Sequence, residues 1–348
     1  LHGDAVRPEP IDLHEKTDAE LVALQLHRND WFCRRAREIL AERAAEGRDL
    51  SAAAESLRRL AETHTDPPRR LRGLWAAQGI GAADPNWLRG RLADEHASVR
   101  AWAVRLLVDD PTGKAVSDGQ PGWVGDAFAK LAKSEPAGLV RLHLAGALEK
   151  QPHRWRWPIA ESLALRTSDA DWRELALLLW YGLRGPVAEE PAKGATLAAT
   201  TPMPTLRRLI ARRLAFDADR SAACAEALVS LLEATAGDGA RRADVTAGIT
   251  AAWEARKKLP LPAGLLALVA EEPALADRLQ EARRRLPGRV EVIELHEDLE
   301  QGDGLRELGL GERAGPARLT GPRRQRAASM RRAQDGAQDE RATLSGTR

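Results

Sequence analysis

A short pattern recurs along this chain and constrains its fold more than any other feature. It consists of an apolar residue followed by Arg, with small or apolar residues three, four, seven and eight positions after the first. In the clearest copy, Val99 and Arg100 are followed by Trp102, Ala103, Leu106 and Leu107. Positions with this spacing form one stripe on a helix of about 3.6 residues per turn. Each copy therefore predicts an amphipathic helix.

Copies of the pattern are separated by roughly 30 to 40 residues, which is close to the spacing of helix-pair repeats. The arginines that mark them are Arg34, Arg72, Arg100, Arg141, Arg173 and Arg207. This period predicts an all-α fold, a HEAT-like α-solenoid in which about seven antiparallel helix pairs are stacked. In such stacks an Arg commonly bonds to an acidic residue or a helix end of the neighbouring repeat, so we expect these arginines near the seams between repeats.

The composition favours helices and a surface on which positive and negative charges nearly balance. Residues that favour strands are scarce, with one Tyr and three Phe among 348 residues, whereas Ala, Leu, Arg and Glu favour helix. The formal net charge is +2, and Arg and Glu alternate along the expected helices, which is typical of solvated helix faces. Phosphate contacts need clustered Lys or Arg, so this balance argues against nucleic acid as a partner of the repeats.

Pro and Asp residues indicate helix boundaries. Asp84-Pro85 and Pro158 each precede an apolar stripe. Because Pro at the first helical position leaves no hydrogen bond unmade, both predict helix starts. Asp109-Asp110-Pro111 and Gly185-Pro186 predict helix ends.

The pattern divides the chain into a linker (residues 1–9), a helical repeat domain (10–286), an irregular segment (287–315) and a basic tail (316–348). The tail repeats Arg without apolar partners, so it is predicted to be disordered. The basic tail would bind nucleic acid or an anionic surface, or it would have no function. No stretch reaches the roughly 20 apolar residues that span a bilayer. The first residues lack Met and a signal peptide, so we expect an internal piece of a longer protein.

Five of these segments resemble a known family. They are Asn29–Arg37, Val99–Leu107, Leu139–Ala145, Leu179–Gly182 and Leu206–Leu214. They are similar to the HEAT-repeat region of large, membrane-bound, haem-binding dehydrogenase-like proteins of planctomycetes. In that family an exported chain carries a sorbosone-dehydrogenase-like β-propeller, then helical repeats, then a c-type cytochrome domain with a CxxCH motif. The resemblance implies a connecting scaffold in a periplasmic electron-transfer protein, with the propeller and cytochrome domains as partners.

The chain departs from this family where the chemistry would lie. Neither Cys33 nor Cys224 is followed by Cys and His at the spacing of CxxCH, so covalent haem attachment is not expected here. We expect no catalytic residue, cofactor or metal in this chain, and haem c only in the parent protein. One alternative is a HEAT-like DNA-repair enzyme, an alkylbase glycosylase, or another nucleic-acid-binding protein. Another is a tetrapyrrole-handling enzyme on the same scaffold.

Two groups of side chains are candidates for interaction. His143 holds the stripe position that Trp102 holds in its own repeat, so we expect it at a helix interface, as a hydrogen-bonded core residue or as a ligand. His153, Trp155 and Trp157 lie close together in sequence. They would contact a cofactor edge, or they would close one helix pair and start the next.

Tryptophan is unusually frequent, with ten Trp against one Tyr. Those on the predicted stripes or helix starts include Trp102, Trp172 and Trp180. We expect them to pack in the core and between helices. The alternative is an exposed aromatic row that grips a partner or a nucleobase.

Overall fold

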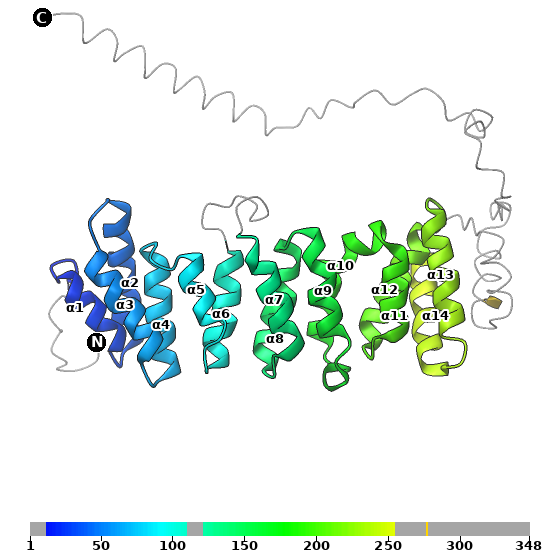
Figure 1. The fold of residues 1–348 in the computed structure, drawn as a ribbon, viewed down its shortest axis with the longest axis horizontal. Helices are drawn as coiled ribbons and strands as arrows, with labels where there is room; N and C mark the ends of the chain where they lie inside the picture. The colour runs from blue at the N-terminus through cyan, green and yellow to red at the C-terminus, as the bar shows by residue number, and fades with distance from the viewer. Residues whose placement is uncertain (1–11, 110–120, 255–275, 278–348) are drawn as a thin grey trace, which may run out of the picture. The chain divides into compact units, whose positions relative to one another are not determined.

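The computed structural model describes residues 12–109, 121–254 and 276–277. These residues form α-helices, short 3₁₀ helices and loops, with no strand among them (Figure 1). The all-α prediction is confirmed for this part of the chain, which belongs to a single unit, Leu1–Leu295. The predicted linker, irregular segment and basic tail lie outside the described residues. So do residues 10–11, 110–120, 255–275 and 278–286 of the predicted repeat domain.

Consecutive helices form seven pairs within the described residues, and we number these pairs as repeats 1 to 7. The first helices are α1 (Asp18–Ala23), α3 (Ser51–Thr63), α5 (Pro85–Arg91), α7 (Trp123–Ser134), α9 (His153–Ala164), α11 (Pro191–Thr200) and α13 (Ala222–Ala234). The second helices are α2 (Asp30–Ala45), α4 (Pro67–Gly79), α6 (Ala97–Val108), α8 (Gly138–Ala147), α10 (Arg173–Glu189), α12 (Pro204–Asp217) and α14 (Gly239–Glu254). Short 3₁₀ helices occupy Leu24–Leu26 (η1), Leu148–Lys150 (η3) and Thr167–Asp169 (η4).

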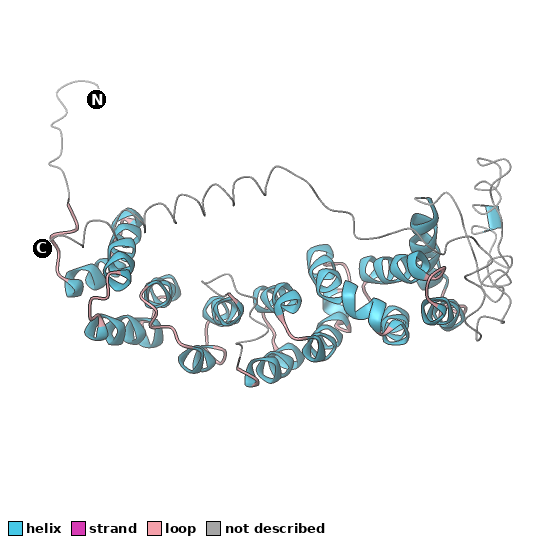
Figure 2. Ribbon diagram, turned by 90° about the horizontal axis from the view of Figure 1, so that it is seen from above, coloured by secondary structure: helices cyan, strands magenta, loops and turns pink. Residues whose placement is uncertain are grey.

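The helices form two layers. Each second helix packs against the second helix of the next repeat, from α2 and α4 through to α12 and α14. First helices form the other layer, with contacts between α1 and α3, α7 and α9, and α11 and α13 (Figure 2). The extensive helix contacts all join elements of the same or adjacent repeats. This is the nearest-neighbour arrangement of a stacked repeat protein.

The core lies between the two layers. One cluster of buried side chains joins repeats 1 and 2 and includes Leu40 and Leu57, while a larger cluster extends from Ala61 in α3 to Trp253 in α14. Fully burying a Leu or Ile side chain stabilises by roughly 1.5–3 kcal/mol. The apolar stripes predicted from the sequence therefore provide the contacts that hold neighbouring repeats together.

Proline marks one helix start as predicted but does not mark two other boundaries. Asp84 caps α5, and its side chain accepts a hydrogen bond from the backbone N–H of Trp87 (3.0 Å). The predicted start at Pro158 is wrong, because α9 already begins at His153 and contains this proline. The predicted end at Gly185-Pro186 is also wrong, because α10 continues to Glu189.

A contact from α9, the other helix of the same repeat, explains how α10 tolerates Pro186. A proline inside a helix leaves the carbonyl four residues earlier without its donor. That carbonyl belongs to Gly182, and Arg156 of α9 donates a hydrogen bond to it (3.4 Å). Tertiary contact thus replaces the lost helical bond, which the local sequence does not reveal.

Helices α12 and α14 approach closely at Gly248. A Cβ atom at this position would lie 2.4 Å from the backbone oxygen of Arg208. We expect Gly248→Ala to lower the free energy of unfolding by roughly 1–3 kcal/mol, because the backbone must move to admit the methyl group. The matched control is Gly146→Ala in α8, where nothing lies within 4 Å of a Cβ. It should be neutral or stabilise by up to about 1 kcal/mol. Urea unfolding measures both, and equal stabilities would contradict the close packing.

Candidate functional site: the inter-repeat arginines and the second-helix face

The fourth residue of the second helices is an arginine in most repeats. The seven fourth residues are Cys33, Arg70, Arg100, Arg141, Ala176, Arg207 and Arg242. We call Arg70, Arg100, Arg141 and Arg207 the ladder arginines. Their side chains are 4–13% exposed. Burying a guanidinium is costly unless it is paired and hydrogen-bonded, so their partners decide whether they stabilise the stack.

Arg141 shows the full arrangement. Its Nε and Nη2 atoms donate to the two carboxylate oxygens of Asp169, both at 2.7 Å. Nη1 donates to the backbone oxygens of Glu135 (3.2 Å) and Pro136 (2.6 Å), in the loop before its own helix. Asp169 ends η4 in the following repeat, and its side chain is 5% exposed. One guanidinium therefore ties its own inter-helix loop to the next repeat through a bidentate ion pair.

Arg100 and Arg70 repeat this scheme. Arg100 binds both carboxylate oxygens of Glu135 at 2.9 and 2.5 Å and also the backbone oxygen of Asp94 (2.8 Å). Arg70 binds the carboxylate of Asp94 (2.6 Å) and the backbone oxygen of Ala61 (3.0 Å). In both cases the carboxylate belongs to the next repeat. The carboxylates are themselves oriented, since the N–H groups two residues later donate to Asp94 (2.9 Å) and Glu135 (2.8 Å).

The acidic partner is replaced where the preceding repeat lacks the arginine. In repeat 5 the fourth residue of α10 is Ala176. In the next repeat the loop position that Asp94 and Glu135 hold, two residues before the helix cap, is Thr201. Its hydroxyl donates to the backbone oxygen of Ala164 (2.7 Å). At this seam the arginine and the loop carboxylate are both absent, which is consistent with a pairing role for the two groups where they occur.

Three of the six predicted register arginines do not hold the ladder position. Arg34 is exposed and pairs with Asp30 on its own helix (2.6 Å), and Arg173 is the exposed first residue of α10. Arg72 lies two residues after the ladder arginine of α4. The predicted equivalence of these three with Arg100, Arg141 and Arg207 is wrong, because an apolar residue followed by Arg occurs at different distances from the helix start.

Arg72 still crosses a seam, in the opposite direction. It donates to the backbone oxygen of His27 (3.0 Å) and pairs with Asp30 (3.3 Å), both in repeat 1. The ladder position of repeat 1 is Cys33, whose thiol contacts the same His27 oxygen (3.4 Å). A thiol is a weak donor. Arg72 therefore supplies the charged donor that repeat 1 lacks, and its predicted place near a seam is confirmed.

The pKa of Glu135 lies below its ordinary range. Burial alone would raise this pKa, but hydrogen bonds from Arg100 and from the Ala137 N–H outweigh burial. Because the folded-state pKa is depressed, the ionised pair contributes stability above the unfolded-state pKa of about 4.3. That contribution is lost as the pH falls through the folded-state pKa.

Glu135→Gln should therefore remove part of the acid sensitivity of the fold. At pH 7 we expect it to lower the free energy of unfolding by about 1.5–3 kcal/mol, the usual worth of a hydrogen bond to a charged group. Below about pH 4.3 its deficit relative to the wild type should shrink. Urea unfolding between pH 3 and pH 7 measures this, with the exposed Glu55→Gln as control. A constant deficit at every pH would contradict the depressed pKa.

Tryptophans lie at contacts between helices, as predicted, but several stay partly exposed. Trp102 of α6 packs edge-on against Trp75 of α4, with ring centres 5.0 Å apart. Trp172 lies at Gly138, the start of α8, where a Cβ would be 3.0 Å from the indole. Trp180 packs against the larger core cluster. All four indoles are half-buried, so they combine core packing with some exposed aromatic surface.

His143 lies at the edge of a hollow of about 350 Å³ on the second-helix layer. Its neighbours there include Arg105 and Asp109 of repeat 3 and Lys150 of η3. Burial, followed by the charge of Arg105, lowers the pKa of His143, so the imidazole is neutral at pH 7. It is half-buried and faces the hollow, not the interior of the core.

His153 and Trp157 contact adjacent residues, whereas Trp155 contacts a different helix. Trp157 is buried, and its Nε1 donates to Glu190 (2.7 Å) before α11. Trp155 packs against Gly125 of α7. The His153 ring lies 3.3 Å from Glu189 at the end of α10. His153 and Trp157 therefore connect α9 to the junction of α10 and α11, and Trp155 connects it to α7, in line with a role between helix pairs.

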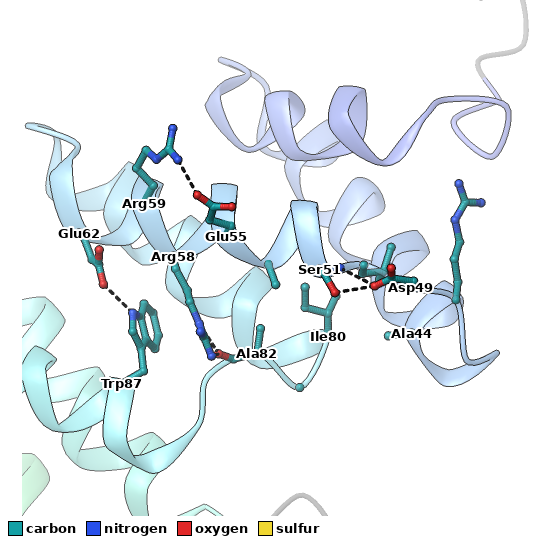
Figure 3. A pocket seen from close by; sticks show the side chains of 14 residues that line it. Ala44, Asp49, Ser51, Glu55, Arg58, Arg59, Glu62, Ile80, Ala82 and Trp87 are labelled. Carbon is teal, nitrogen blue, oxygen red and sulfur yellow. Dashed lines mark hydrogen bonds and ion pairs between the residues drawn. The ribbon is translucent and has the colours of Figure 1, made fainter.

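A groove of about 800 Å³ runs beside α3 (Figure 3). At one end Trp87 Nε1 donates to Glu62 (2.6 Å), and Arg58 lies over the indole, 5.7 Å from its centre. At the other end Ser51 Oγ donates to Asp49 (2.6 Å). Hydrogen bonds from Ser51 hold the pKa of Asp49 below its ordinary range. A carboxylate of low pKa is a weak general base, so this pair fits a helix start better than a nucleophile.

The sequence interpretation missed Arg70 and four carboxylates that bind the ladder arginines: Asp94, Glu135, Asp169 and Asp244, the last of which binds Arg207 at 2.5 Å. A usable signal for Arg70 was Asp66-Pro67, the same kind of start as Asp84-Pro85, because counting four residues from it reaches Arg70. The carboxylates lie 24 to 37 residues after their arginines, and no local pattern pairs residues at that distance.

No protein-family model and no curated protein matches the chain. Within the described ranges, no three or more His, Cys, Asp and Glu side chains gather where they would hold a metal ion. No described helix combines the length and apolar character needed to cross a membrane. The function is therefore argued from the contacts and from the surface that the helices expose.

Proposed function

We propose that this chain is a non-catalytic helical-repeat scaffold that mediates protein–protein interaction. The observation that carries the proposal is that its buried charged residues bind one another between repeats. Each ladder arginine is hydrogen-bonded to a carboxylate of the next repeat, at distances of 2.5–2.9 Å. This chemistry holds a stack of helices in register and leaves the second-helix face available to partners.

The exposed apolar residues support binding by the second helices. Four of the six large apolar side chains that are exposed among the described residues lie on second helices: Trp31, Leu139, Tyr181 and Phe216. Their exposed fractions are 40–51%. Aromatic residues and Arg are enriched in protein interfaces, and both are present on this face.

The family resemblance extends this proposal to a longer parent protein. There the repeats would connect a propeller to a c-type cytochrome domain in an exported, sugar-dehydrogenase-like protein, and haem would be held by the parent alone. The sequence that flanks this chain in its gene tests the extension. A propeller before the repeats and a CxxCH motif after them would support it, and absence of both would contradict it.

Nucleic-acid binding, including alkylbase glycosylase activity, is the second candidate, and one observation favours it. In the described structure the second helices carry 18 Arg and no Lys against eight Asp and Glu, whereas the first helices carry nine basic and eight acidic residues. The net charge of the whole chain is close to zero, but the layer of second helices is basic. Binding of a fluorescent oligonucleotide that weakens steeply with salt would support this candidate.

Site-specific photo-crosslinking of the full chain in its source cells tests the scaffold proposal. A benzoylphenylalanine at Tyr181 reports on the second-helix face. The same group at Leu165, which follows α9 and is similarly exposed (48% against 50%), is the matched control. We expect discrete protein adducts at position 181 and few at position 165. Equal adducts at both positions, no adduct at either, or adducts removed by nuclease would contradict the proposal.

A further inference from the structure

The hollow beside His143 continues an aromatic and basic belt across three repeats. Arg37 of α2 lies over Trp75 of α4, 5.4 Å from the ring centre. Trp75 packs on Trp102 of α6, and Arg105 lies over Trp102 at 4.9 Å. Arg105 also lines the hollow. We call Arg37, Trp75, Trp102 and Arg105 the Trp–Arg belt. It leads along the second helices directly into this hollow.

The hollow presents donors that are only partly used. Asp109 accepts one hydrogen bond from Arg105 Nε (3.0 Å) and one from Lys150 Nζ (2.5 Å). Within the residues that the structure describes, no hydrogen bond uses the Nη atoms of Arg105 or the other ammonium protons of Lys150. Both side chains are about half exposed. Two cations and one carboxylate leave one net positive charge for an incoming anion.

Apolar walls flank these donors. Leu142 of α8 and Leu178 of α10 line the hollow and are half-buried, and Trp102 lies beside Arg105. Of the second helices that line the hollow, α6 and α8 carry three Arg and no acidic residue, and α10 carries two Arg and two Glu. The complementary ligand is therefore anionic at one point and apolar on either side of it.

We propose that the hollow binds an acidic side chain of an extended segment in a partner protein. In this arrangement the carboxylate accepts hydrogen bonds from Arg105 and Lys150, and neighbouring apolar side chains pack on Trp102, Leu142 and Leu178. This inference rests on the proposed scaffold function and specifies the chemistry of its partner.

The pairing of the surface charges favours a peptide over a nucleic acid. A nucleic-acid strand requires a row of free cations along its backbone. Most exposed arginines of this layer are already paired, such as Arg35 with Glu38 (2.9 Å) and Arg208 with Asp244 (2.9 Å). The hollow, with a volume of about 350 Å³, is also large enough for one side chain of a peptide but too small for a nucleic-acid duplex.

Fluorescence anisotropy with a labelled peptide tests the inference. The probe is a 12-residue peptide of alternating Glu and Leu, and its neutral comparison alternates Gln and Leu. We expect the full chain to bind the Glu peptide at least about ten-fold more tightly, and Arg105→Gln to weaken that binding about ten-fold, as expected for loss of one charge-assisted contact. Lys150→Gln should act in the same direction.

Arg154→Gln is the matched control. Arg154 lies over Trp155 (5.8 Å) as Arg105 lies over Trp102, but on the first-helix layer. It should leave binding unchanged, and far-UV circular dichroism confirms that each variant is folded. Equal binding of the two peptides, equal loss in both arginine variants, or tighter binding of an oligonucleotide would overturn the inference. Protein adducts at position 181 without peptide binding would overturn this inference and leave the scaffold proposal standing.

Discussion

Asp169→Ala is expected to lower the free energy of unfolding by about 3–5 kcal/mol, the usual cost of breaking a buried ion pair. The substitution removes both carboxylate oxygens that Arg141 binds at 2.7 Å. Arg141 is 7% exposed, so its charge would stay buried with only the backbone oxygens of its own loop as partners. Urea unfolding followed by far-UV circular dichroism measures the loss.

An exposed ion pair provides the control. Glu55 pairs with Arg59 on α3 at 2.8 Å, and both side chains are about 70% exposed. Glu55→Ala should cost less than about 0.5 kcal/mol, because exposed pairs of this kind contribute little. A similar small cost for Asp169→Ala would mean that the ladder does not hold the repeats together.

Phe128→Ala is expected to destabilise by about 3–5 kcal/mol and to split the unfolding transition. Phe128 is fully buried in α7 of repeat 4, in the middle of the stack. Because repeats couple only to their neighbours, a cavity there should separate the unfolding of repeats 1–3 from that of repeats 5–7. Thermal and urea melts followed by circular dichroism detect the second transition.

Leu21→Ala is the comparison at the end of the stack. Leu21 is also fully buried, in α1 of repeat 1. Its loss should cost roughly 2–5 kcal/mol locally but fray only the terminal repeat and leave one main transition. If Phe128→Ala also unfolds in one transition with unchanged steepness, the stack behaves as a single cooperative unit and the nearest-neighbour description is wrong.

The fold class was predictable because repetition averages out local errors. Each stripe is a weak signal, but copies such as Val99–Leu107 and Leu206–Leu214 agree in their period. The structure contains the expected number of helix pairs within the described residues. The ends of individual helices were harder to predict, since Pro158 and Pro186 lie inside helices, and a contact from α9 of the same repeat replaces the hydrogen bond lost at Pro186.

The ladder was only half predictable. Arg100, Arg141 and Arg207 follow an apolar residue and also hold the fourth position of their helices, so both criteria agree. In α4 they disagree: Arg72 follows Leu71, but Arg70 holds the fourth position and is buried. What matters physically is the distance from the helix start, because this brings the guanidinium back to the inter-helix loop. The carboxylates that pair with these arginines could not be predicted, because they lie far away in sequence and only the fold brings them close.

Hydrogen–deuterium exchange tests most directly the central claim that buried charge pairs and core contacts couple each repeat only to its neighbours. Mass spectrometry would compare the wild type with Asp169→Ala under native conditions. We predict faster amide exchange in α7–α10, on both sides of the Arg141–Asp169 seam, with α1–α4 and α13–α14 unchanged. Faster exchange spread evenly over all repeats, or none near this seam, would contradict the claim.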